Sequence, residues 1–228
     1  MHILPQPNNC SYETQKGYAQ AGNAMSFRLL RQLYDGSNLI CSPLSLQYAL
    51  AMTANGASGE TLQEIIDFLG YGAEGIDALN AYCKTLLDQL QTISWADIEN
   101  GLTTDAKVNV RLPKFDIENK FNLIDPLKEL GIKRAFNRDA AELGCMFEPK
   151  EEAYQYWIGQ VIQKARVTVA EWGVKAAAVT VVGVSGATAA EPEPIIKEVN
   201  FYADHPFAYF IAESTSNTIL FEGVYTGR

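Results

Sequence analysis

The sequence is short of positive charge. Its 228 residues carry 18 lysines and arginines against 27 aspartates and glutamates, which gives a net charge of −9. Binding to nucleic acid needs clustered lysines and arginines that neutralise phosphates, and an anionic membrane surface attracts the same clusters. The charge balance therefore argues against both, and we expect neither a nucleic-acid partner nor a membrane partner.

Long apolar runs are also lacking. Residues 1–18 show no basic start followed by an apolar run, and no stretch elsewhere is long enough to span a bilayer. We therefore expect no signal peptide in this chain and no transmembrane helix.

Histidine and paired cysteines are scarce as well. Of the two histidines, His2 lies in a loose start and His205 directly precedes Pro206, so a Ser-His-Asp hydrolase lacks a well-placed base. The cysteines have no CxxC spacing, and neither a glycine-rich phosphate loop nor a dinucleotide fingerprint occurs. We therefore expect no catalytic residue, no cofactor and no metal site. The four cysteines are Cys10, Cys41, Cys83 and Cys145.

What the sequence does contain is an ordered series of helical and extended patterns. Apolar residues at steps of three and four predict the helices, and Ser42 before Pro43 is typical of a helix start. Period-two alternation predicts the strands. Helices come first and strands follow, which is typical of an α+β fold. Helices are expected over residues 13–34, 43–55, 58–69, 76–90 and 121–130. Strands are expected over residues 38–41, 107–115, 157–170, 195–202, 207–213 and 218–225.

Residues 173–190 differ from the rest of the chain. Alanine, glycine, valine, serine and threonine dominate, and no charged residue occurs between Lys175 and Glu191. On composition alone, one interpretation is a disordered linker.

Four segments resemble the serpin family of protease inhibitors and occur in the family's order. The first is similar to the strand and paired helices near the family's N-terminus, and the third to the last fixed strand of the main sheet with the hinge of the reactive loop. The fourth is similar to the closing strands. The segments are NLICSPLSLQYALAMTANGASGETLQEI (38–65), KVNVRLPKFDIENKFNLIDPLKELGIKRAF (107–136), VIQKARVTVAEWGVKAAAVTVV (161–182) and NFYADHPFAYFIAESTSNTILFEGVY (200–225).

The resemblance implies one serpin-like α+β domain over residues 1–228. Its helical part would be residues 1–92, packed on antiparallel sheets, and its strand-rich part residues 107–228, with the reactive loop at about 171–200. A long central block of the family is missing, because only about Ile93 to Ala106 joins the third helix to the LPKF strand. By analogy, that block holds the strands on the far side of the main sheet. We therefore expect a shortened serpin with a reduced main sheet, arising as a gene fragment, a deletion product or a naturally reduced member.

A serpin offers its loop as bait to a serine or cysteine protease, and the cleaved loop then inserts as a new strand into the main sheet. Every second side chain becomes buried on insertion, so small uncharged residues are required. Trp172 and Val174 depart from the family's usual residues, but Val174 is small enough to insert. The hinge residues carried over from the family are Glu171, Gly173, Val174, Ala176, Ala177, Ala178 and Thr180.

Counting from Gly173 as the family does places the reactive bond between Ala187 and Thr188. The loop is long beyond this point, so the bond can lie anywhere in residues 184–190. A small residue before the bond suits elastase-like or subtilisin-like proteases. Trypsin-like proteases do not fit, because residues 176–191 contain no lysine or arginine.

The function implied by the resemblance is a serine-type protease inhibitor and not an enzyme. The missing block favours an alternative, a non-inhibitory binding or remnant protein whose truncated main sheet cannot trap a protease. An exposed sheet edge also predicts self-association. Serpin resemblance agrees with either an extracellular or a cytoplasmic location.

Overall fold

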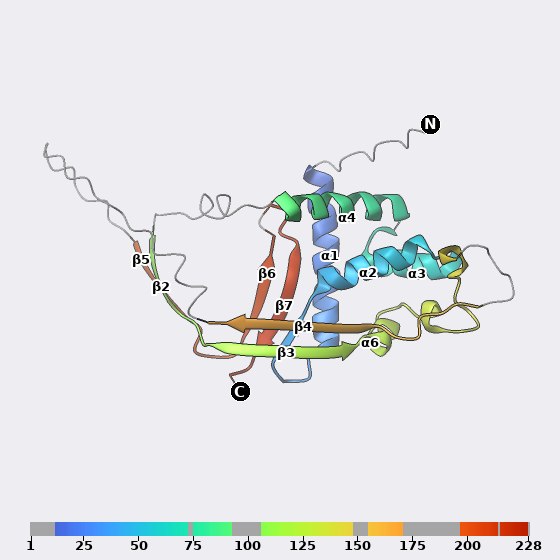
Figure 1. The fold of residues 1–228 in the computed structure, drawn as a ribbon. Helices are drawn as coiled ribbons and strands as arrows, with labels where there is room; N and C mark the ends of the chain where they lie inside the picture. Colours follow the sequence, from blue (N-terminus) through green and yellow to red (C-terminus); the bar gives the residue numbers. More distant parts are fainter. Residues whose placement is uncertain are drawn as a thin grey trace, which may run out of the picture.

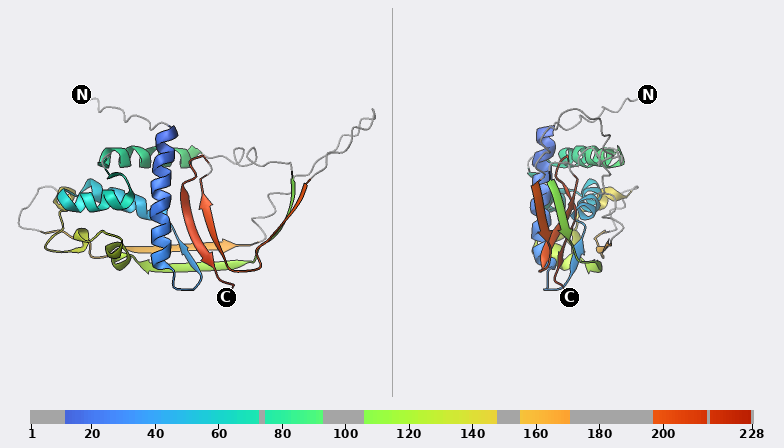
Figure 2. Two further views of the ribbon diagram at one scale, coloured as in Figure 1. Left: turned by 180° about the vertical axis from the view of Figure 1, so that it is seen from behind. Right: turned by 90° about the vertical axis from the view of Figure 1, so that its left-hand side faces the viewer.

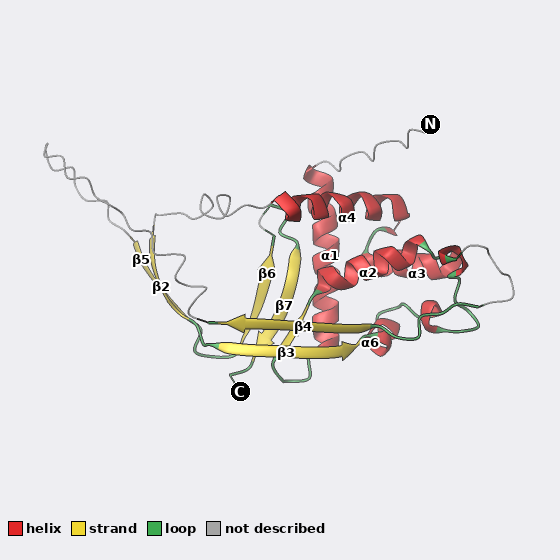
Figure 3. Cartoon of the chain, viewed as in Figure 1, coloured by secondary structure: helices red, strands yellow, loops and turns green. Residues whose placement is uncertain are grey.

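The structure is a computed structural model that describes residues 12–72, 75–92, 106–147, 155–170, 197–213 and 215–227. Its helices and strands follow one another as the α+β expectation requires (Figure 3). The helices are α1 (Tyr12–Leu33), α2 (Pro43–Asn55), α3 (Gly59–Leu69), α4 (Gly75–Thr92) and α6 (Ile124–Glu129). The strands are β1 (Leu39–Cys41), β2 (Ala106–Arg111), β3 (Phe115–Asn122), β4 (Ile162–Val169), β5 (Lys197–Tyr202), β6 (Phe207–Ala212) and β7 (Ile219–Tyr225).

Local chemistry sets the helix boundaries where the sequence predicted them. The Ser42 hydroxyl accepts a hydrogen bond from the Ser45 amide at 3.3 Å, and Pro43 fills the first turn of α2, where no backbone donor is needed. Gly70 ends α3 in the left-handed region with φ 84°, a conformation that glycine adopts without strain.

The strands form three small sheets. The first has the order β1-β7-β6 and is antiparallel, the second pairs β2 with β5 in parallel, and the third pairs β3 with β4 antiparallel. In Figure 1, β3 and β4 cross in front of β6, β7 and α1. The view from behind in Figure 2 shows α1 running alongside β7, in front of the β3-β4 pair. The β3-β4 pair therefore lies across one side of both α1 and the β6-β7 strands.

Three expected elements differ from the sequence prediction. The strand expected over 107–115 ends at Arg111 as β2, and Phe115 begins a separate strand, β3, because it pairs with β4 and not with β5. The expected helix over 121–130 begins only at Ile124, because Phe121 and Asn122 pair with Gln163 and Ile162 as the end of β3. The expected strand over 157–170 begins only at Ile162. The residues before Ile162 do not pair with β3, and the Ile158 amide instead donates a hydrogen bond to the Ala135 carbonyl at 2.8 Å.

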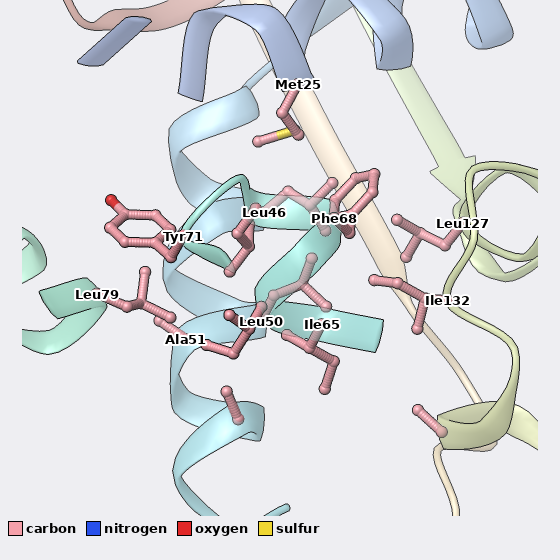
Figure 4. Packing of buried hydrophobic residues seen from close by; sticks show 14 of the residues in the cluster. Met25, Leu46, Leu50, Ala51, Ile65, Phe68, Tyr71, Leu79, Leu127 and Ile132 are labelled. Atoms are coloured by element: carbon pink, nitrogen blue, oxygen red, sulfur yellow. The ribbon is translucent and has the colours of Figure 1, made fainter. Parts of the chain in front are cut away.

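The main core lies among the helices. Side chains from α1 to α4 meet those of α6 and the segment after it, as Figure 4 shows for Met25, Leu50, Phe68, Leu127 and Ile132. A second, smaller cluster of Ile40, Ile117 and Ala165 lies where β1 meets β3 and β4. The smaller cluster therefore joins the β1-β7-β6 sheet to the β3-β4 pair, whose strand β4 precedes the predicted loop.

Candidate functional site: the strand that precedes the predicted reactive loop

Strand β4 ends at Val169, just before the predicted hinge. It pairs with β3 along its whole length, from Ile162 opposite Asn122 to Val169 opposite Phe115. The predicted hinge and bond residues, Glu171 to Thr188, lie outside the described residues. The structure therefore describes the fixed frame of the candidate site, and the assignments within the loop stay predictions.

The solvent-facing side of the β3-β4 pair carries cross-strand ion pairs. The Arg166 Nε donates to Asp116 Oδ1 at 2.8 Å, the Thr168 hydroxyl donates to the same oxygen at 3.0 Å, and Lys164 Nζ lies 3.0 Å from Glu118 Oε1. Hydrogen bonds from Arg166 and then Thr168 lower the pKa of Asp116 to about 2. Because these groups are exposed, the pairs define the register more than they add to stability.

The opposite side of β4 is buried in alternation. Gln163 and Ala165 are buried, and Val167 and Val169 are half-buried, which is the phase that the sequence predicts for this strand. Ala165 packs with Ile117 of β3 and Ile40 of β1. The buried side therefore anchors β4 on the neighbouring sheet.

Two side-chain amides fasten the β3-β4 pair to the segment around β1. Gln163 Oε1 accepts from the Ser42 amide at 3.1 Å, and Gln163 Nε2 donates to the Ser42 carbonyl at 2.8 Å. Asn119 Oδ1 accepts from the Ile40 amide at 2.8 Å. These bonds pair the Ser42 and Ile40 amides, and they give the Ser42 carbonyl a second donor besides the Leu46 amide. They explain why a polar residue interrupts the apolar phase of β4.

In the sequence, Gln163 is a polar interruption of the apolar phase that Val161, Ala165, Val167 and Val169 share, and no neighbouring residue indicates its partner. Asn119 carried no signal at all, because an asparagine within an alternating segment is normally taken as solvent-facing. Both partners become evident only when β3 and β4 are placed against β1.

The second edge of β4 has no partner strand among the described residues, since β3 is the only strand there that pairs with it. Beside the beginning of β4 lies a hollow of about 250 Å³. One wall comes from Ser45, Leu46 and Ala49 of α2, and the rest from Leu123 and residues 161–164. The frame therefore offers both an unpaired backbone edge and open space next to it.

Within the described ranges, no group of three or more histidine, cysteine, aspartate or glutamate residues is arranged to hold a metal ion. No helix among the same residues has the length and apolar character needed to cross a bilayer.

Comparison with known proteins shows which family the chain resembles. The family model for serpin (serine protease inhibitor) matches residues 20–104 and 80–227. Serpin B5 of Xenopus tropicalis is 36% identical over 127 residues, which is 56% of this chain and 30% of that protein. The leukocyte elastase inhibitor of Homo sapiens is 37% identical over 120 residues, 53% of this chain and 29% of that protein. The matched stretches thus span about a third of the length of these relatives.

Solved structures show the same fold. Human thyroxine-binding globulin superposes with a TM-score of 0.67 at 14% identity, covering 92% of this chain and 98% of that chain. With 228 residues the chain is short relative to full serpins. Because the family model accounts for most of its length, the chain belongs to the serpin (serine protease inhibitor) family.

Proposed function

We propose that this chain is a serine-type protease inhibitor that presents the loop at about residues 171–200 as bait, with Ala187-Thr188 as the reactive bond. The observation that supports this most directly is the frame of β4. The strand ends at Val169, is held in register by β3, and has no described strand on its other edge. Serpins are inhibitors rather than enzymes, and we propose that this chain is likewise an inhibitor and not an enzyme.

The proposed insertion follows from strand geometry. A segment that leaves β4 and turns back along its free edge runs antiparallel to β4, and its backbone can bond to the unpaired N–H and C=O groups. Small residues at Val174, Ala176 and Ala178 would let alternate side chains enter against the layer of α2. The hollow beside Ser45 and Ala49 provides space at the far end of that path.

The proposed partner is a protease with a specificity pocket for small side chains. Ala187 precedes the bond, and no lysine or arginine lies nearby in the loop. The name of the human relative, leukocyte elastase inhibitor, agrees with an elastase-like target.

Residual protease activity tests the proposal. The chain is titrated into elastase, subtilisin and, as a control, trypsin, and we expect loss of activity with the first two only. Ala178→Arg places a charge on the inserting face, so this variant should still be cleaved while leaving the protease active. Ala187→Asp should instead protect the loop from cleavage. Full elastase and subtilisin activity at a large excess of the unmodified chain would refute inhibition.

A second candidate function is that of a non-inhibitory binding or remnant protein. This alternative is favoured because β4 has only one described neighbouring strand, β3. An inserted loop would therefore hydrogen-bond to β4 alone and not to a strand on each side. The fold neighbour thyroxine-binding globulin is a binding protein by its name. Cleavage near Ala187 with fully active protease would support this alternative. Residues 1–228 forming one domain, and self-association through the free main-sheet edge, also remain proposals.

A further inference from the structure

The outer edge of β6 is open within the described part of the chain. β7 pairs with one side of β6, and no described strand pairs with the other. Three large apolar side chains lie at this edge, Phe210 and Ile211 of β6 and Phe27 of α1, exposed by 45%, 44% and 45%. Phe27 and Phe210 pack edge to face with ring centroids 5.6 Å apart. We call these three residues the β6 edge patch.

The strand lacks the charged residues and prolines that commonly protect an edge from pairing. Its sequence is FAYFIA, with a high share of aromatic residues, and its one irregularity is a register shift against β7 between Ile211 and Ala212. The next acidic residue, Glu213, is buried and its carboxylate accepts hydrogen bonds from the Thr215 and Ser216 amides at 2.6 Å. The Glu213 carboxylate is therefore hydrogen-bonded within the adjacent turn and places no charge at the open edge of β6.

We propose that β6 pairs antiparallel with β6 of a second copy of this chain, about a two-fold axis. A strand edge complements itself in this arrangement, because each open N–H can meet a C=O of the same segment in the other copy. The two three-stranded sheets then join into one continuous sheet of six strands. An uncharged strand brings no like charges together there, although the whole chain carries −9.

The patch also selects the register. Phe210 lies on the face of the sheet that α1 covers, as its contact with Phe27 shows. A two-fold axis perpendicular to the sheet keeps both α1 helices on one face. If the axis passes beside Phe210, that residue faces its own counterpart and Ala208 faces Ala212. The two Phe27-Phe210 pairs then form one cluster of four rings over the axis, in which offset and edge-to-face contacts are favourable.

A second apolar surface, on the β2-β5 pair, provides the matched comparison. Val108, Val110 and Phe201 are exposed by 52%, 50% and 55%. Both strands of this pair carry charged residues, Arg111 on β2 and Glu198 on β5, whereas β6 carries none. A charged edge resists self-pairing, so β6 is the assigned interface.

The test is the solution mass of the chain, measured by light scattering after size exclusion. The monomer mass is 25.1 kDa, and we expect twice this value at micromolar concentration. Phe210→Lys places like charges opposite each other at the axis and should raise the dimer dissociation constant more than about tenfold. Phe27→Lys changes only the helix side of the patch, so it tests the interface even if Phe210→Lys does not fold. Val110→Lys and Met52→Lys, at exposed apolar positions elsewhere, should leave the dimer unchanged.

Disulfide formation tests the symmetry. In a background with Cys10 and Cys145 changed to serine, Phe210→Cys should cross-link to itself, because directly opposed residues lie within disulfide range. Val110→Cys is the control and should remain reduced. The proposal is overturned by a monomeric chain, by a dimer that Val110→Lys abolishes and both patch variants leave intact, or by open-ended oligomers in place of a dimer. None of these measurements involves a protease, so the result is independent of the inhibitor proposal.

Discussion

Glu222 and Cys41 lie side by side on neighbouring strands β7 and β1, with Glu222 Oε1 3.6 Å from Cys41 Sγ. Neither side chain is accessible to solvent. The second carboxylate oxygen, Oε2, is buried without a hydrogen-bond partner in the structure. Burial raises the pKa of Glu222 to about 7, although hydrogen bonds from Ser26 and Cys41 act in the opposite direction. Burial, followed by the charge of Glu222, raises the pKa of the Cys41 thiol as well.

This pair predicts that the protein becomes less stable as the pH rises through neutrality. The folded pKa of Glu222 is raised, so the neutral acid is the form that the core accommodates. Its contribution is fully present below the unfolded pKa of about 4.5 and is lost as the pH rises to about 7 and beyond. The unfolding free energy in urea should fall by about 2 kcal/mol between pH 5.5 and pH 8.5. Glu222→Gln should flatten this profile, and an equally steep profile in that variant would assign the effect to another group.

Because Gln163 is hydrogen-bonded to the Ser42 backbone, replacing it by an apolar side chain of similar size should destabilise the protein. Gln163→Leu leaves the buried Ser42 amide without its acceptor and removes one of two donors to the Ser42 carbonyl, so the unfolding free energy should fall by roughly 1–3 kcal/mol. The matched control is Gln63→Leu on the exposed face of α3, which should change stability by less than about 0.5 kcal/mol. If the two substitutions lower the unfolding free energy in urea equally, the hydrogen bonds between Gln163 and Ser42 add no measurable stability.

The crossing of Tyr209 over Gly223 makes that glycine necessary. The Tyr209 hydroxyl reaches past it to donate to the Leu39 carbonyl at 3.1 Å, and a Cβ at position 223 would collide with both the ring and that carbonyl. Gly223→Ala should therefore lower the unfolding free energy by roughly 2–4 kcal/mol. Gly159→Ala is the control, since nothing lies within 4 Å of its added Cβ. A Gly223→Ala protein as stable as the control would contradict the close packing of β1, β7 and β6.

How far the sequence predicted this structure depended on the range of the interactions involved. The helix start at Ser42-Pro43 and the burial phase of β4 were predictable, because capping and alternation act between near neighbours in sequence. The start of α6 was wrong by three residues, because pairing of Phe121 with distant Gln163 overrides a local helical pattern. The partners of Gln163 and Glu222 lie more than a hundred residues away, so local patterns carried no signal for them.

The candidate site also has a part that the sequence predicted and a part that it did not. The family resemblance predicted a bait loop at about 171–200, whereas composition alone indicated only a disordered linker, and the comparisons confirm the serpin fold. The free edge of β4 was expected from the block of strands that the resemblance implied to be missing. The hollow beside α2 could not be predicted, since it depends on how separated segments pack together.

Formation of a covalent complex tests the inhibitor proposal most directly. The chain is incubated with elastase, denatured, and analysed by gel electrophoresis and mass spectrometry, with Ala178→Arg as the matched hinge variant. We expect a band at the mass of elastase plus the chain cut after Ala187, resistant to denaturant and absent from the variant. Quantitative cleavage at Ala187 with no such band and fully active elastase would contradict it, and would leave the chain as a serpin-like substrate that does not trap its protease.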